Sequence, residues 1–144
     1  MQLKILSWNI WCGTHLEGVI EFLKNADADI VALQEVCEDN RGNLAEVIAK
    51  KLGYKYTHAV GMNFPVRFIP GYNPNDKKTI KFGTAILSKY KIVKSEVIEL
   101  TKEDKRLIIK ADIEVEDEIF HVFSVHLKHT HQNPSELRDL QAEN

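Results

Sequence analysis

Three polar residues in this sequence lie at the ends of apolar segments, where folding would bring them to the rim of a core. Glu35 and Asn9 close the first two such segments, and His126 lies in the last. A carboxylate is costly to bury without a partner, so the position of Glu35 favours a metal ion or another cation beside it. The simpler alternatives are a surface salt bridge for Glu35, a turn cap for Asn9 and a hydrogen-bonded histidine at a strand end for His126.

Histidines in the last part of the chain offer a different chemistry. His126, His129 and His131, with His121 upstream, carry imidazoles of the kind that bind Zn²⁺. The sequence shows no fourth ligand of the usual type, and a passage from strand to loop orients such side chains poorly. Zinc is therefore the less favoured alternative, although it would change the class of the site.

Two tryptophans flank Asn9 in the sequence. Trp8 and Trp11 could stack on a base or sugar of a substrate. Core packing is the more common use of such residues, and we expect it for both.

A strand-helix-strand unit positions the first two polar residues. Residues 2–10 alternate between two faces, which predicts a strand with one largely apolar face. A capping-box signature at Thr14 and the apolar stripe after it predict a helix over about 14–25. Asp29–Val36 is short and apolar enough to be a buried strand. If both strands share a sheet, a right-handed crossover makes them parallel, and their carboxyl ends meet at one edge.

Further elements are expected to cover and extend this unit. Asn43 is a capping signature and Gly53 a left-handed stop, so a second helix should lie between them. A long loop over residues 61–76 is expected to be functional or mobile. A third capping signature at Asn133 predicts a last helix. Strands are predicted at residues 54–60, 82–87, 91–100, 106–115 and 119–127.

Length and composition indicate one domain of ordinary type. The 144 residues are 44% hydrophobic and 28% charged, with a net charge of −2 and a pI of about 6.3. No global positive field would hold long nucleic acid, so any such substrate must be gripped locally. Lys77, Lys78 and Lys81 form a small basic group, which a solvated loop explains equally well. The sequence predicts no membrane span and no signal or transit peptide, so we expect a cytoplasmic location.

The two cysteines, Cys12 and Cys37, follow no zinc or redox spacing. They come just after the ends of the first two strands and could be neighbours. A disulfide is rare in a reducing compartment, so we expect buried free thiols.

Four motifs follow one another along almost the whole chain. They are Ile5-Leu6-Ser7-Trp8-Asn9-Ile10, Asp29-Ile30-Val31-Ala32-Leu33-Gln34-Glu35-Val36, Phe82-Gly83-Thr84-Ala85-Ile86-Leu87-Ser88 and Phe123-Ser124-Val125-His126-Leu127. In this order they resemble the N-terminal half of the endonuclease/exonuclease/phosphatase superfamily, the deoxyribonuclease-I-like proteins. The most specific part is a Gln-Glu pair closing an apolar strand, preceded by a strand that ends in Trp-Asn.

The resemblance implies an α+β fold, a four-layered α/β/β/α sandwich of which this chain is about the first half. It also implies a nuclease or phosphatase that hydrolyses a phosphodiester or phosphomonoester with Mg²⁺ or Mn²⁺. By the family pattern Glu35 binds the metal, and His126 contacts the scissile phosphate. Asn9 lies in the same half of the metal site and helps to orient the catalytic aspartate and the phosphate. Carboxylate and amide oxygens are the ligands that a hard divalent cation prefers. The expected partner is a phosphate-ester substrate, either nucleic acid or a small phosphorylated molecule.

The chain departs from the family in its second half. A Gly-Asp-x-Asn segment and a terminal Asp-His pair occur nowhere in the sequence. They normally supply the base that activates water, and general acid-base catalysis is worth about 10²–10⁴-fold. We therefore expect residues 1–144 to form one incomplete domain that is nearly inactive alone. The alternative is a non-catalytic binding or assembly module that keeps the half-fold and self-associates through exposed strands.

Overall fold

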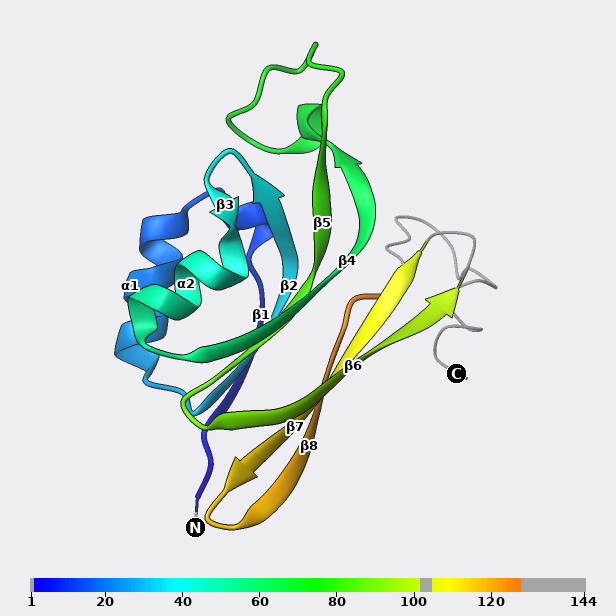
Figure 1. Ribbon diagram of the computed structural model, residues 1–144. Helices are drawn as coiled ribbons and strands as arrows, with labels where there is room; N and C mark the ends of the chain where they lie inside the picture. The colour runs from blue at the N-terminus through cyan, green and yellow to red at the C-terminus, as the bar shows by residue number, and fades with distance from the viewer. Residues whose placement is uncertain (1, 102–104, 128–144) are drawn as a thin grey trace.

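Two β-sheets stack against each other, and helices cover the outer face of the larger one (Figure 1). The computed structural model describes residues 2–101 and 105–127. The larger sheet has the strand order β1 (Ile5–Asn9), β2 (Ile30–Asp39), β5 (Thr79–Ser88) and β4 (Lys55–Pro65), with the short β3 (Gly42–Asn43) beside β2. The smaller sheet is β6 (Lys91–Thr101), β7 (Arg106–Val115) and β8 (Glu118–Val125). The helices are α1 (Leu16–Ala26), α2 (Leu44–Leu52) and the short 3₁₀ turns η1 (Trp11–Gly13) and η2 (Val66–Phe68).

This arrangement confirms the α+β class predicted from the sequence. The described residues supply three layers in the order helices, sheet, sheet, and the fourth layer of the sandwich is not among them. The last predicted helix, which begins at Asn133, lies outside the described residues, as do His129 and His131. Neither α-helix in the described part of the chain is long and apolar enough to cross a membrane.

Strands β1 and β2 are parallel neighbours, as the crossover rule predicts. Their register places Asn9 opposite Gln34, so Asn9 lies next to the residue that precedes Glu35. The carboxyl ends of both strands therefore meet at one edge of the larger sheet.

A β-bulge interrupts β2 at Glu35. Gln34 pairs with Thr84 and Val36 pairs with Gly83, which leaves Glu35 as the extra residue, and its φ of 55° is left-handed. A bulge turns the side chain of the extra residue away from the regular alternation of the strand. Gly83 permits the close approach of the strands here, because a Cβ at this position would lie 1.8 Å from the Ala59 carbonyl oxygen.

Two separate hydrophobic cores hold the layers together. The first lies between the helices and the larger sheet, and the second lies between the two sheets. The first contains, among others, Val19, Ile20, Leu23, Leu33, Val36, Leu44, Ile48 and Leu87. The buried residues of the second are Ile30, Ala59, Ile86, Ile109, Ala111, Ile113 and Val115. Their alternation in β7 buries every second side chain, as the sequence predicts.

The structure confirms the caps predicted for α2 and contradicts the cap predicted for α1. Asn43 caps α2 by accepting hydrogen bonds from the Ala45 and Glu46 amides, and Gly53 ends that helix in the left-handed conformation, as predicted. The capping box predicted at Thr14 is wrong, because α1 starts after His15 and has no side-chain cap. The Thr14 hydroxyl donates instead to the Trp11 carbonyl oxygen at 2.8 Å, since the chain makes a 3₁₀ turn before the helix.

One further expectation needs correction. The loop predicted over residues 61–76 is shorter, because β4 continues to Pro65 and η2 follows it.

Strand β8 carries apolar side chains on both faces. In the described part of the chain Ile119, Phe123 and Val125 are exposed on its outer face.

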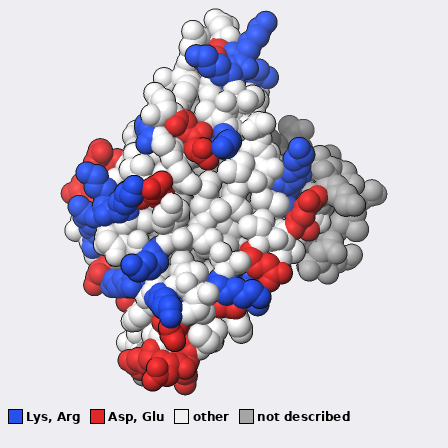
Figure 2. Space-filling model, in the orientation of Figure 1, with Lys and Arg blue, Asp and Glu red and all other residues white. Residues whose placement is uncertain are grey.

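Charge gathers at two ends of the face shown in Figure 2. Lys and Arg side chains lie over the tip formed by the loop between β4 and β5, and Asp and Glu side chains lie over the β7–β8 turn. Within the predicted basic group, Lys81 is paired with Glu38 at 3.0 Å. The loop position of Lys77 and Lys78 agrees with the simpler explanation, that of a solvated loop.

Removing a side chain between the sheets should cost far more than removing its exposed counterpart. Ile113→Ala empties a site in the second core and should lower the free energy of unfolding by about 2–5 kcal/mol. Ile119→Ala, on the exposed face of the neighbouring strand, should change it by less than about 1 kcal/mol. Urea denaturation measures both, and equal losses would contradict the assignment of the core.

Candidate active site

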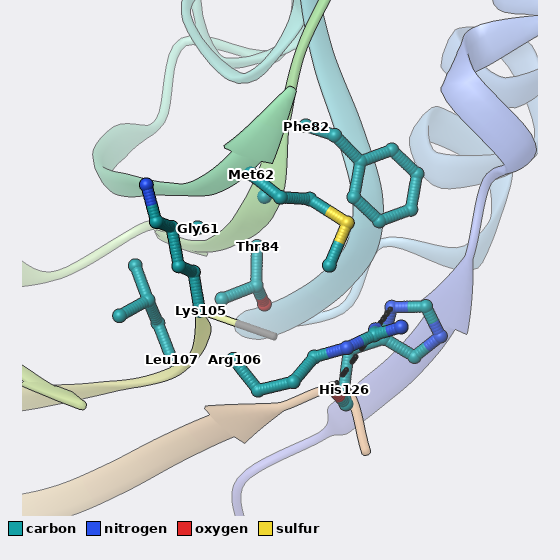
Figure 3. Close-up of a pocket in the computed structure, with 9 residues that line it drawn as sticks. Gly61, Met62, Phe82, Thr84, Lys105, Arg106, Leu107 and His126 are labelled. Atoms are coloured by element: carbon teal, nitrogen blue, oxygen red, sulfur yellow. Dashed lines mark hydrogen bonds between the residues drawn. The ribbon is translucent and has the colours of Figure 1, made fainter. Parts of the chain in front are cut away.

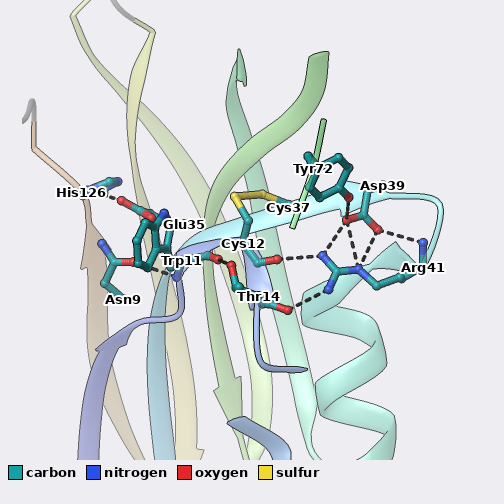
Figure 4. The surroundings of a disulfide bond; sticks show 11 residues. Asn9, Trp11, Cys12, Thr14, Glu35, Cys37, Asp39, Arg41, Tyr72 and His126 are labelled. Carbon is teal, nitrogen blue, oxygen red and sulfur yellow. Dashed lines mark hydrogen bonds and ion pairs between the residues drawn. A yellow bond between two sulfur atoms is a disulfide. The ribbon is translucent and has the colours of Figure 1, made fainter. Parts of the chain in front are cut away.

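Residues from both sheets meet at one edge of the molecule (Figure 4). Glu35 Oε1 of β2 lies 3.6 Å from Nε2 of His126, which follows β8. Asn9 and Glu35 line the same open cleft, together with Trp11. The structure therefore brings together all three residues singled out from the sequence.

Glu35 owes its position to the bulge. Its left-handed backbone is unfavourable for a residue with a side chain, and such strain is often found at functional sites. The carboxylate is only partly exposed, at 21% of its side-chain surface, and it faces the cleft. It is thus an acidic group at the rim of a core, held where a cation can reach it.

Asn9 is oriented by the turn that follows it. Its Oδ1 accepts a hydrogen bond from the Trp11 amide at 3.0 Å. Asn9 is therefore a turn cap, the simpler alternative foreseen from the sequence. A carboxamide oxygen has two lone pairs, so the same atom can also bind a cation, while Nδ2 can donate to a phosphate oxygen.

His126 rests against Arg106, a residue that the sequence analysis missed. Arg106 Nη1 lies 3.1 Å from His126 Nδ1 and donates to the His126 carbonyl oxygen at 3.3 Å. Arginine has only donors, so Nδ1 is the acceptor, and a neutral His126 carries its proton on Nε2, the atom that faces Glu35. The sequence offered little reason to select Arg106, because this residue follows a run of charged residues that is typical of a solvated turn.

A small pocket opens beside this pair (Figure 3). Arg106 and His126 form one wall, and Met62, Phe82 and Leu107 supply apolar surface. The His126 ring is 5.9 Å from the Phe82 ring, measured between centroids. The apolar contacts restrict the movement of the imidazole.

Beneath the cleft, buried hydroxyls join the two sheets. The Thr84 and Ser124 hydroxyl oxygens are 2.5 Å apart, and the Thr84 hydroxyl is 2.8 Å from the Leu33 carbonyl oxygen. Gln34 Nε2 donates to Ser7 Oγ at 3.2 Å and to Ser124 Oγ at 3.5 Å. Since Ser124 is two residues before His126, this bridge fixes the distance between His126 and Glu35.

The donor set fits a hard divalent cation of low protein coordination. Mg²⁺ is commonly bound by one or two carboxylates and keeps several waters, and here Glu35 and the Asn9 oxygen face one cleft. No group of three or more His, Cys, Asp or Glu side chains suited to a metal occurs among the described residues. His121 does not contribute to the alternative zinc site, because its imidazole lies on the outer face of β8, where Nδ1 is 2.6 Å from Asp112 Oδ1.

Solved structures with the same architecture come from several organisms. An endonuclease/exonuclease/phosphatase from Beutenbergia cavernae is 17% identical, with a TM-score of 0.73 over 98% of this chain and 42% of that one. The D. rerio TDP2 complexed with a single-strand DNA product is 20% identical, with a TM-score of 0.70 over 98% of this chain and 52% of that one. The human Nocturnin catalytic domain is 20% identical, with a TM-score of 0.69 over 90% of this chain and 52% of that one. At such identities the likeness establishes the fold.

The sequence itself matches the Endonuclease/Exonuclease/phosphatase family over residues 6–143. The chain belongs to this family. Members of the family are phosphoesterases. A search of curated protein sequences finds no match. The chain spans about half the length of the similar structures, between 42% and 52% for these three.

In this member of the family, Cys12 and Cys37 are joined by a disulfide, and the prediction of free thiols is wrong. The adjacent strand ends bring the two buried cysteines together, which sequence spacing alone could not decide. The bond links the segments that follow Asn9 and Glu35 (Figure 4).

A second link between the same segments is Arg41. Its guanidinium donates to the Cys12 and Gly13 carbonyl oxygens at 2.8 and 2.7 Å and to the Asp39 carboxylate at 2.6 Å. Burial of Asp39 tends to raise its pKa, but hydrogen bonds from Arg41 and Tyr72 outweigh burial and hold the pKa below its usual value. Nothing in the sequence pattern pointed to the contacts of Arg41 with Cys12 and Gly13, which lie far from it along the chain.

Arg41→Met should destabilise the protein because it removes the cation that is paired with a buried carboxylate, leaving that carboxylate only the hydrogen bonds from Tyr72 and from the residue 41 amide. The Asp39 side chain is 2% exposed, and we expect a loss of about 2–4 kcal/mol in the free energy of unfolding. Arg67→Met on η2, which removes an exposed arginine, is the matched control and should cost less than about 1 kcal/mol. Denaturant unfolding at neutral pH measures both.

The pH dependence of that loss identifies Asp39 as its source. A lowered folded-state pKa stabilises the fold fully above the unfolded value of about 3.9 and ceases to do so as the pH falls through the lowered value. The difference between wild type and Arg41→Met should therefore shrink below about pH 4. A difference that does not change with pH would contradict the role of this ion pair.

Proposed function

We propose that this protein is a divalent-metal-dependent hydrolase of phosphodiester or phosphomonoester bonds, in which Asn9, Glu35 and His126 form the half-site supplied by this chain. The observation that carries the proposal is the convergence of Glu35 and His126 from different sheets, 3.6 Å apart, beside Asn9. A carboxylate next to a histidine in an open cleft suits a cation bound together with a phosphate. Family membership supports phosphoester chemistry.

Each side chain has a distinct part in the proposed site. Glu35 and the Asn9 oxygen would hold Mg²⁺ or Mn²⁺, which when bound supplies Lewis-acid polarisation of a phosphoryl oxygen. The Asn9 amide nitrogen and the His126 Nε2 proton donate hydrogen bonds to the phosphate. Arg106 holds His126 in the required tautomer and adds positive charge near the phosphate.

We propose that residues 1–144 do not supply the group that activates water, because they contain neither the Gly-Asp-x-Asn segment nor the Asp-His pair of the family pattern. The chain would then bind phosphate esters but hydrolyse them about 10²–10⁴-fold more slowly than a complete site. Nuclease and phosphatase activities both suit the site. The D. rerio TDP2 structure in complex with a DNA product favours a nucleic-acid substrate by analogy alone.

Metal binding tests the proposal directly on this chain. Titration with Mn²⁺, followed by electron paramagnetic resonance, should show one site that Glu35→Gln weakens by more than about tenfold, because a direct ligand matters at least as much as its supporting residues. Glu38→Gln is the matched control, since Glu38 lies on the same strand and pairs with Lys81. Equal affinity of wild type and Glu35→Gln for Mn²⁺ would refute the metal site.

A second candidate function is a binding or assembly module that self-associates. It is supported by the exposed apolar face of β8, where Phe123 is 54% exposed. Sedimentation equilibrium distinguishes the two candidates: a monomer that binds Mn²⁺ supports the hydrolase, and a stable oligomer that does not bind Mn²⁺ supports the module.

A further inference from the structure

The two tryptophans of this chain have different environments. Trp8 packs against the first core, and its ring meets the Phe22 ring edge to face at 4.8 Å, which confirms core packing for this residue. Trp11 is 56% exposed, so the same expectation is wrong for it. It lies instead beside Glu35 in the cleft of the proposed site (Figure 4).

Hydrogen bonds hold the backbone that carries the exposed Trp11 ring. Trp11 has a left-handed φ of 44°, which is a genuine outlier for a bulky residue. Its amide donates to Asn9 Oδ1, and its carbonyl oxygen accepts from the Thr14 amide and hydroxyl. The next two carbonyl oxygens, of Cys12 and Gly13, are held by Arg41. A large apolar side chain is thus held in an unfavourable conformation at the surface, where solvent exposure gives it no packing benefit.

Trp11 lines two hollows. The first is the cleft that it shares with Asn9 and Glu35. The second is a groove along the start of α1, which it lines with Ile10, Thr14, Gly18 and Val19, among others. A group attached to a phosphate in the cleft would lie over the indole ring or in this groove.

We propose that Trp11 is a specificity residue that stacks on the nucleobase next to the reacting phosphate, so that the substrate is a nucleotide or a single-stranded nucleic acid. The inference rests on the proposed phosphoester site and names its substrate class. An indole face stacks on any base, so little dependence on base identity follows.

The lining of the groove favours a base over a second phosphate. No Lys or Arg is among the residues that line it, and His15 is its one titratable side chain in the described part of the chain. A polyphosphorylated small molecule would need cations there to neutralise its further charges. A flat, uncharged ring needs only an aromatic partner and apolar walls.

The test compares ligands that differ only in the base. In the presence of Mn²⁺, isothermal titration calorimetry should show that the chain binds adenosine monophosphate roughly 5- to 150-fold more tightly than ribose 5-phosphate. Trp11→Ala should abolish this preference by weakening the binding of adenosine monophosphate far more than that of ribose 5-phosphate, while Trp11→Phe should keep most of the preference. Phe68→Ala is the control, because Phe68 is an equally exposed aromatic residue outside the cleft.

Fluorescence gives an independent readout. In a Trp8→Phe background Trp11 is the sole tryptophan, and adenosine monophosphate should quench its emission while ribose 5-phosphate should not.

The possible failures differ from one another. Equal binding of the two phosphates to wild type, or an equal loss of both in Trp11→Ala, would overturn the stacking role and leave the phosphoester site intact. Tighter binding of octyl phosphate than of adenosine monophosphate would overturn it in favour of a lipid substrate. Failure of both sugar phosphates to bind would overturn the phosphoester site and the inference together.

Discussion

The structure depends on how the two sheets are fixed to each other. An apolar core of β-branched and small side chains sets the spacing of the sheets but, being non-directional, does not fix their relative position along the strands. The buried hydroxyls of Thr84 and Ser124 fix this relative position, because a hydrogen bond between them requires one alignment of β5 and β8. His126 then lies against Glu35 rather than elsewhere along the edge of the larger sheet. Polar contacts inside an apolar interface thus determine the geometry of the site.

Three non-glycine residues with left-handed backbones lie at the edge of the larger sheet that carries the site. Glu35 at a bulge and Trp11 and Cys12 in the turn after β1 all have left-handed backbones without being glycine. Such conformations persist only where the surroundings enforce them. Here the Cys12–Cys37 disulfide and the hydrogen bonds from Arg41 to the Cys12 and Gly13 carbonyl oxygens join the turn after β1 to the segment around the end of β2. These links and the strained residues belong to the same few segments. This explains how a small open edge can keep several polar side chains in a fixed arrangement.

The parallel strands, the bulge and the strand before His126 position the three residues of the proposed site, and all of them fall within residues 6–143, which match the family. Trp11 and Arg41 lie within the same range, but in the connections that follow β1 and β2. Connecting segments often carry the specificity of related proteins. The apolar outer face of β8 shows a further consequence of the described layers, since a sheet with one uncovered face exposes side chains that suit burial.

The sequence by itself determined the elements and the candidate residues. Alternation in β7, the cap at Asn43 and the stop at Gly53 depend on neighbours a few positions away, and parallel pairing of β1 and β2 follows from chain handedness. It could not determine contacts between residues that are distant in the chain. Arg106 against His126, Arg41 against Cys12 and Gly13, the disulfide and the exposure of Trp11 all arise when the sheets stack and the turn after β1 closes. Local patterns record periodicity and propensity, whereas these contacts depend on the relative placement of whole layers, which only the tertiary structure fixes.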